Sequence, residues 1–268
     1  MKDTFFSLPR FTNLCRKEMV ENWKSNLLRV VVVYGVMTVV MVWNGYFEYQ
    51  DRYNVDRDYA WSFLLVFFMA SLWIFGCLSA SFTMEKMKTK TSRIAILMLP
   101  ATPFEKFFSR WLVSTIAFLF IFLICYKLAD YTRVLIFSLL CPENKFIAPV
   151  DLTHLVGEAD YYTLCRTHQE FGAMLAGYFF FQSLFVLGSS IWPKNSFVKA
   201  YSAIAITVVV YVSVATLLIR ILIPNKNLVV MSNTELFCTM IVGGILFTLV
   251  NWILAYMRFK ESEIINRM

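Results

Sequence analysis

Residues Ser81 to Trp111 read SFTMEKMKTKTSRIAILMLPATPFEKFFSRW and separate two strongly hydrophobic stretches. The first half, Met84 to Arg93, carries four basic side chains and one acidic side chain, and Ile94 to Leu99 is an apolar hexad before Pro100. A basic helix, an apolar turn and a proline-fixed return to the membrane would form a rigid elbow that suits partner binding. The alternative is a solvated basic face that attracts anionic lipid headgroups.

The composition outside this segment is that of a membrane protein. Of the 268 residues, 59% are hydrophobic and only 16% are charged, and the mean hydropathy is +0.61. Soluble domains contain about 45–50% apolar and about 25% charged residues. Several runs approach the roughly 18 apolar residues that a helix needs to cross a bilayer core. We therefore predict an all-α integral membrane protein.

Six hydrophobic runs are predicted to span the membrane as helices. Three capping boxes, in which a Ser or Thr and a Glu three residues later satisfy helix-start amides, indicate helix entrances at Thr102–Glu105, Thr167–Glu170 and Ser232–Glu235. Gly172 with Ala176 has a spacing that permits close helix approach, either within this bundle or at a dimer seam. The approximate spans are 27–46, 60–80, 111–128, 171–192, 200–223 and 235–257.

The charge distribution predicts the orientation of the chain. Seventeen of the 25 Lys and Arg residues lie in the two terminal segments, in 81–110 and in 193–199. The positive-inside rule therefore places both termini and segment 81–110 in the cytoplasm and loop 129–170 outside, in a multi-pass cell membrane protein. Phe11 to Trp23 has apolar residues at spacings of three and four, which favours a surface helix over an extension of the first span.

Signatures of enzymes are missing from the sequence. His154 and His168 are the only histidines, and Cys165-x-x-His168 with Glu158 is a weak metal pattern that we interpret as ordinary loop residues. We expect no catalytic residue, metal or cofactor in this chain. The net charge of +7 is spread among membrane-flanking segments, so we expect no nucleic acid partner. Without a P-loop motif, ATP binding would require another polypeptide.

Two residue pairs in or next to the loop 129–170 also allow predictions. Cys141 and Cys165 share this loop and either form a disulfide, if the loop faces an oxidising compartment, or remain two thiols. Lys127 and Asp130 are placed to pair across one helical turn at the end of the third span.

The residues LMLPATPFEKFFSRW, Leu97 to Trp111, resemble the segment before the third span in permease subunits of the type 2 ABC exporter family. In that family, Leu-Pro-x-Thr/Ser-Pro leads into a Glu-Lys pair and then the helix. The resemblance extends to a surface helix, six spans and a cytoplasmic coupling helix between spans two and three. The chain departs from the family between spans five and six, where Pro224 to Thr234 is too short for re-entrant helices.

The resemblance implies an exporter permease that forms the substrate pathway as a dimer, with a second copy or a paralogue, and binds a cytoplasmic ABC ATPase subunit. The rival hypotheses are a gradient-driven secondary transporter and a membrane scaffold that transports nothing. By the resemblance, the ATPase contact falls on Met84, Glu85, Lys86, Met87, Lys88, Lys90 and Arg93, and the elbow of the coupling segment falls on Leu99, Pro100, Thr102, Pro103 and Glu105.

Overall fold

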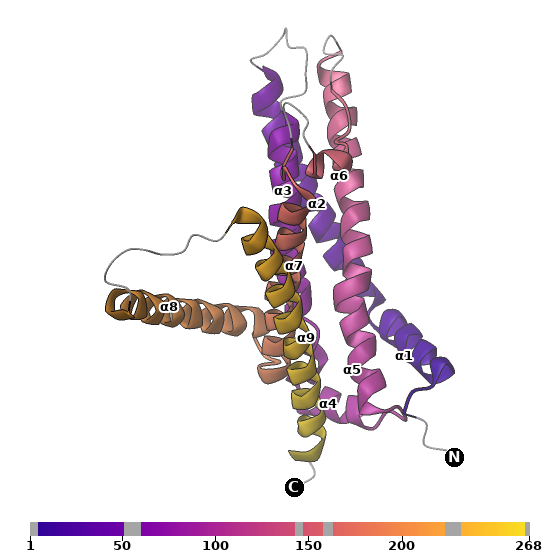
Figure 1. Cartoon of the computed structure of the whole chain (residues 1–268). Helices are drawn as coiled ribbons and strands as arrows, with labels where there is room; N and C mark the ends of the chain where they lie inside the picture. Colours follow the sequence, from indigo (N-terminus) through magenta and orange to yellow (C-terminus); the bar gives the residue numbers. More distant parts are fainter. Residues whose placement is uncertain (1–4, 51–59, 143–146, 158–162, 223–231, 266–268) are drawn as a thin grey trace. The chain divides into compact units, whose positions relative to one another are not determined.

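The computed structural model describes residues 5–50, 60–142, 147–157, 163–222 and 232–265 (Figure 1). Two compact units divide the chain: one comprises residues 1–76 and 112–171, and the other comprises 77–111 and 172–268. All regular elements in the described ranges are helical, apart from one isolated bridge between Val156 and Cys165. The prediction of an all-α protein is therefore confirmed for these residues.

Long helices account for most of both units. Three short elements interrupt them: the 3-10 turns η1 (Glu85–Lys88) and η3 (Leu152–Leu155), and the π-helical turn η2 (Val113–Ala117). The α-helices are α1 (Leu8–Glu21), α2 (Trp23–Gln50), α3 (Ala60–Ser81), α4 (Lys90–Leu97), α5 (Pro103–Leu112), α6 (Phe118–Leu140), α7 (His168–Ile191), α8 (Ser196–Leu222) and α9 (Asn233–Ile265).

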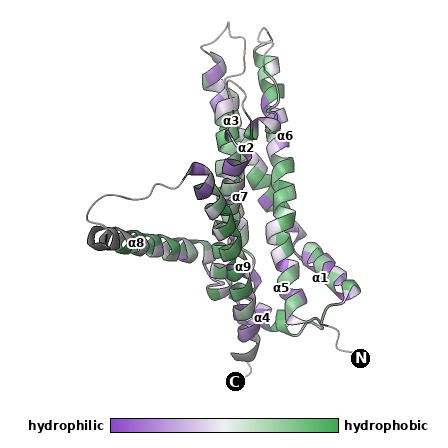
Figure 2. Ribbon diagram, in the orientation of Figure 1, coloured by the Kyte–Doolittle hydropathy of each residue, from purple (hydrophilic) through white to green (hydrophobic). Residues whose placement is uncertain are grey.

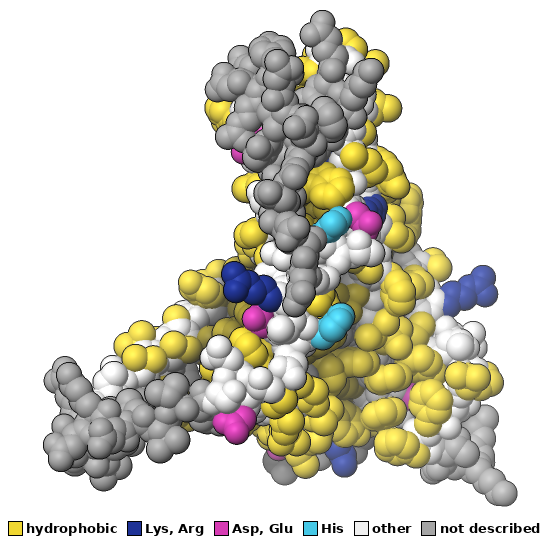
Figure 3. All heavy atoms as spheres, turned by 45° about the horizontal axis from the view of Figure 1, so that its top comes forward, with side chains coloured by type: hydrophobic (Ala, Val, Ile, Leu, Met, Phe, Trp, Pro, Cys, Tyr) yellow, Lys and Arg dark blue, Asp and Glu magenta, His cyan; other side chains and the backbone are white. Residues whose placement is uncertain are grey.

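Among the described residues, six helical stretches are long and apolar enough to cross a membrane, as the sequence predicted. Hydrophobic residues dominate these helices, whereas α1 is mixed (Figure 2). Apolar side chains also cover much of the described surface in the space-filling view (Figure 3). Lipid is the medium that such a surface requires. The six stretches are Trp23–Tyr49, Ala60–Ser81, Pro103–Leu140, His168–Ile191, Ser196–Val214 and Asn233–Ser262.

The third stretch is longer than predicted. It runs for 38 residues from Pro103 to Leu140, through α5, η2 and α6. Residues 129–140, which we assigned to the outer loop, are therefore helical. The charges that lower the local hydropathy, Asp130 and Arg133, form an ion pair one turn apart on α6. Because each neutralises the other, the helix continues past them.

Capping at three helix starts matches the sequence prediction to different degrees. At the start of α5 the box is complete: Thr102 N donates to Glu105 Oε2 at 3.1 Å, and Glu105 N donates to Thr102 Oγ1 at 3.3 Å. The Thr167–Glu170 pair has the amide-to-hydroxyl bond, and the Ser232–Glu235 pair has the amide-to-carboxylate bond.

Glycines allow helices to pack closely within each unit. A Cβ on Gly45 of α2 would lie 2.4 Å from the Phe137 ring of α6. A Cβ on Gly188 of α7 would lie 2.6 Å from Ala200 Cβ of α8. Real Cβ atoms do not approach so closely, so both positions require glycine at these backbone separations.

Candidate functional site

The segment between α3 and α5 is folded differently from the predicted basic helix and apolar turn. Glu85–Lys88 forms the 3-10 turn η1, and α4 begins at Lys90 after Thr89, whose backbone is extended (φ −107°, ψ 147°). Thr89 Oγ1 accepts a hydrogen bond from Ser92 N at 3.3 Å and caps α4. The cap starts a new helix inside the basic stretch, so Ile94 to Leu97 is helical rather than a turn.

Two methionines anchor this segment to its own unit. Met84 and Met87 are 0% and 4% exposed and belong to one hydrophobic cluster with Ile96 and Phe107. The same cluster contains residues of α7, α8 and α9, among them Val186, Ala200 and Phe259. Both methionines were predicted to contact a partner, but they face the interior instead. Methionine side chains fill irregular apolar gaps well, which suits this position.

The basic side chains of the segment differ in exposure. Lys88 and Lys90 are exposed, whereas Glu85, Lys86 and Arg93 are half-buried. Arg93 donates to Met87 O from Nε at 3.4 Å and from Nη2 at 3.1 Å, which ties α4 to η1. The outward face available to a partner is therefore centred on Lys88 and Lys90.

The elbow between α4 and α5 is fixed by polar contacts that the sequence pattern did not reveal. Leu99 and Pro100 lie in the bends that follow α4, and Pro103 is the first residue of α5, which starts with the complete capping box. Lys106, which is buried, donates from Nζ to Leu97 O at 2.9 Å, at the end of α4. A cation at a helix C-terminus pairs with the carbonyls that have no helical partner. Such a bond from α5 back to α4 depends on the tertiary fold, so spacing alone could not reveal it.

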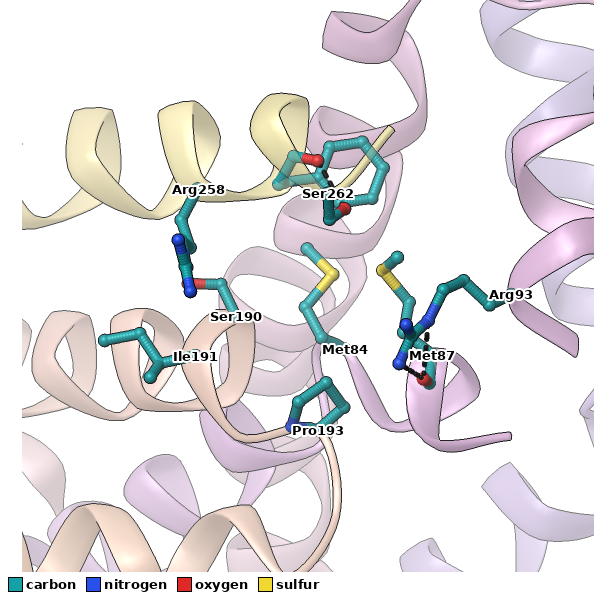
Figure 4. A pocket seen from close by; sticks show the side chains of 9 residues that line it. Met84, Met87, Arg93, Ser190, Ile191, Pro193, Arg258 and Ser262 are labelled. Atoms are coloured by element: carbon teal, nitrogen blue, oxygen red, sulfur yellow. Dashed lines mark hydrogen bonds between the residues drawn. The ribbon is translucent and has the colours of Figure 1, made fainter. Parts of the chain in front are cut away.

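A hollow of about 220 Å³ opens between this segment and the ends of α7 and α9 (Figure 4). In the close-up view, Arg93 and Arg258 lie on opposite sides of Met84. Arg258 Nη1 pairs with Glu261 Oε2 at 3.2 Å, and both side chains are largely exposed. The lining residues are Met84, Met87, Arg93, Ser190, Ile191, Pro193, Arg258, Phe259 and Ser262.

A strip of polar side chains lies within the spans of α7 and α9. Gln182 is 0% exposed, and neither its Oε1 nor its Nε2 has a hydrogen-bond partner among the described residues. The hydroxyl of Tyr178, one turn away, is likewise unbonded within the described ranges. Asn251 Nδ2 donates to Ser183 Oγ at 2.9 Å and joins the two helices. Polar groups without partners are costly at membrane depth, and Ser, Asn and Gln side chains there form hydrogen bonds between helices.

The other unit contains a buried ion pair that the sequence misassigned. Asp130 and Arg133, both 0% exposed, form an ion pair at 2.9 Å, whereas we predicted a pair between Lys127 and Asp130. Arg133 also donates to Tyr49 OH and, at 2.8 Å, to Ala148 O. The ion pair thus joins α6 to α2 and to the connection between α6 and α7.

Further contacts fasten the same connection. Asp130 Oδ2 accepts from Val150 N at 2.7 Å, and Lys127 Nζ donates to Val150 O. Trp61 Nε1 donates to Ala148 O at 3.3 Å, and its ring packs on His154 with centroids 5.4 Å apart. These side chains hold the backbone at 148–150 in place. The charged side chains of Asp130 and Lys127 therefore have a structural role.

The cysteines and histidines in and next to the connection between α6 and α7 do not form a joint site in the described residues. No disulfide joins Cys141 to Cys165. Burial raises the pKa of the Cys165 thiol, and the nearby Glu170 carboxylate adds to the rise. Within the described ranges, no three metal-binding side chains gather, and Glu158 lies outside these ranges.

The chain matches no family model, no curated protein and no solved structure. The resemblance to exporter permeases therefore remains an expectation drawn from the sequence.

Proposed function

We propose that this chain is the permease subunit of an ATP-driven ABC exporter and forms the substrate pathway as a dimer. A separate cytoplasmic ATPase subunit would bind segment 81–110. One observation carries the proposal: the segment has an exposed basic face at Lys88 and Lys90 and an inner face anchored in the core of its unit by Met84 and Met87. A partner that pushes the outer face therefore pushes the helices behind it.

The contacts of the inner face define the path of that force. Met84, Met87, Ile96 and Phe107 share one cluster with α7 and α9, and interiors packed in this way transmit displacement. Those two helices carry the polar strip that includes Gln182 and Asn251. Closure of the ATPase would shift the strip between inward and outward states, provided the ATPase contacts differ between them.

The N-terminal helix α1 supports the same proposal. Leu14 is buried, whereas Met19 and Val20 are exposed apolar residues. Lys17 and Glu21 pair at 3.5 Å on the polar side of the helix. We assign α1 to the cytoplasmic membrane surface, where exposed apolar residues insert at the headgroup boundary.

Co-purification tests the docking face. A tagged chain isolated from its native host in mild detergent should bring a P-loop ATPase with it in stoichiometric amount. The amount of ATPase that co-purifies with the K88E/K90E variant should fall at least tenfold, because two exposed contacts are reversed in charge. The matched control K199E/K260E reverses two exposed lysines outside the segment and should retain it. Equal retention by both variants would reject the docking face.

The buried Asp130–Arg133 pair favours one rival function, a gradient-driven carrier. Ionisable groups within spans often belong to proton or ion relays. Here, however, the pair also holds Tyr49 and the backbone at 148–150, so a structural role accounts for it. Proton flux into liposomes containing this chain alone, abolished by D130N, would support the carrier instead.

A further inference from the structure

The hollow that segment 81–110 helps to line lies at the ends of two candidate membrane-spanning helices. The fourth candidate span ends at Ile191 and the sixth ends at Ser262, and both residues line the hollow. Pro193 opens the turn that follows α7. The headgroup layer is about 5–7 Å thick on each side of the hydrocarbon core. The hollow therefore opens at headgroup depth.

The lining combines two guanidinium groups with an apolar wall. Arg93 comes from α4 and Arg258 from α9. Ile191 and Pro193 supply the accessible apolar wall, whereas Met84, Met87 and Phe259 also line the hollow but are almost fully buried. A guanidinium presents a planar set of donors that matches the oxygens of a phosphate group. The wall suits the glycerol and the first carbons of an acyl chain. Both chemical halves of a phospholipid thus find a matching surface.

The two arginines differ in how they would engage a phosphate. The carbonyl of Met87 holds two nitrogens of Arg93, so its guanidinium is already oriented at the wall. Arg258 is paired with Glu261, but exposed ion pairs are weak in water, so a phosphate can compete for this arginine. The Glu261 carboxylate opposes an anion and limits the affinity of the site.

We propose that this hollow binds the headgroup of an anionic phospholipid from the adjoining leaflet. Basic pockets between the ends of membrane helices bind such headgroups. At about 220 Å³ the hollow is smaller than the roughly 300–1,000 Å³ of pockets that enclose drug-sized ligands. It therefore holds a headgroup with the glycerol and the first acyl carbons, and it leaves the rest of the acyl chains in the bilayer. Because η1 and α4 form one wall, the bound lipid stabilises the position of the coupling segment.

Native mass spectrometry of the purified full chain, titrated with phosphatidylglycerol or phosphatidylcholine, tests this site. Phosphatidylglycerol should bind more tightly, since its net charge is negative. Each arginine replaced by glutamine should weaken phosphatidylglycerol binding about fivefold, given the contribution of a basic residue near an anionic surface. The variants are R258Q and R93Q/R258Q, and K199Q/K260Q is the control with two lysines removed outside the lining.

A second variant separates binding from folding, because Arg93 also ties α4 to η1. I191W keeps both arginines and places a bulky ring at the exposed rim of the hollow, so it should also weaken phosphatidylglycerol binding. Millimolar inorganic phosphate should not displace the lipid, whereas displacement would indicate a free-anion site and overturn the proposal. Equal affinity of R258Q, I191W and the control would also overturn it. A variant of the lining that binds lipid as before but no longer co-purifies with the ATPase would overturn it as well. This result would indicate that the hollow receives an acidic side chain of the partner.

Discussion

At the scale of single residues, Asp130 and Arg133 carry the largest energetic consequence. Both are removed from solvent. Each balances the charge of the other, and hydrogen bonds link the pair to Tyr49 and to Val150. The desolvation of a buried ion pair offsets most of its attraction, but removing one partner leaves an uncompensated charge. α6 therefore requires both members of the pair, one turn apart.

Removing one member of this pair should destabilise the protein strongly. We expect R133Q to lower the free energy of unfolding by about 3–5 kcal/mol, because Asp130 stays buried without its cation. Chemical unfolding in detergent measures the change, and D130N/R133Q should be less affected than R133Q alone. The control Y131F alters an exposed neighbour on the same helix. An R133Q protein as stable as Y131F would contradict the assigned role.

At the scale of helices, the close approach of α7 and α8 depends on Gly188. We expect G188A to lower the free energy of unfolding by about 1–3 kcal/mol, because the added Cβ would lie 2.6 Å from Ala200 Cβ. Gly243 on α9 provides the matched control, since a Cβ there meets nothing within 4 Å. G243A should be neutral or stabilising by up to about 1 kcal/mol, because alanine favours helix. Thermal unfolding of the two variants in the same detergent should rank them in this order, and the reverse order would reject the packing.

The same scale shows what sequence patterns can and cannot predict. Long apolar runs predicted the six spans because hydropathy is a local property, and Thr102 with Glu105 predicted the start of α5 for the same reason. Periodicity did not predict the burial of Met84, because this burial depends on packing against α7 and α9. It did not predict the break at Thr89 either, because a local hydrogen bond from Ser92 N to the Thr89 side chain starts α4 there. The bond from Lys106 to Leu97 and the partners of Arg133 depend equally on the tertiary fold.

At the scale of the whole molecule, the proposal requires a fixed orientation in the membrane. Thr91 in α4 and Thr153 in η3 are both exposed, and the positive-inside rule places them on opposite sides. A membrane-impermeant maleimide should label T153C in intact cells and T91C only after permeabilisation. The unsubstituted chain corrects for the natural cysteines. Labelling of T91C from outside would invert the topology and exclude a cytoplasmic ATPase at this segment.

The most direct test of the permease proposal is to identify what contacts Lys88 in the native host. A photo-crosslinking amino acid at position 88 or 90 should capture a P-loop ATPase, because these side chains are exposed on segment 81–110. The same amino acid at position 199 should not capture it. Crosslinks from positions 88 and 90 to lipid alone, or to proteins without a nucleotide-binding domain, would contradict the account.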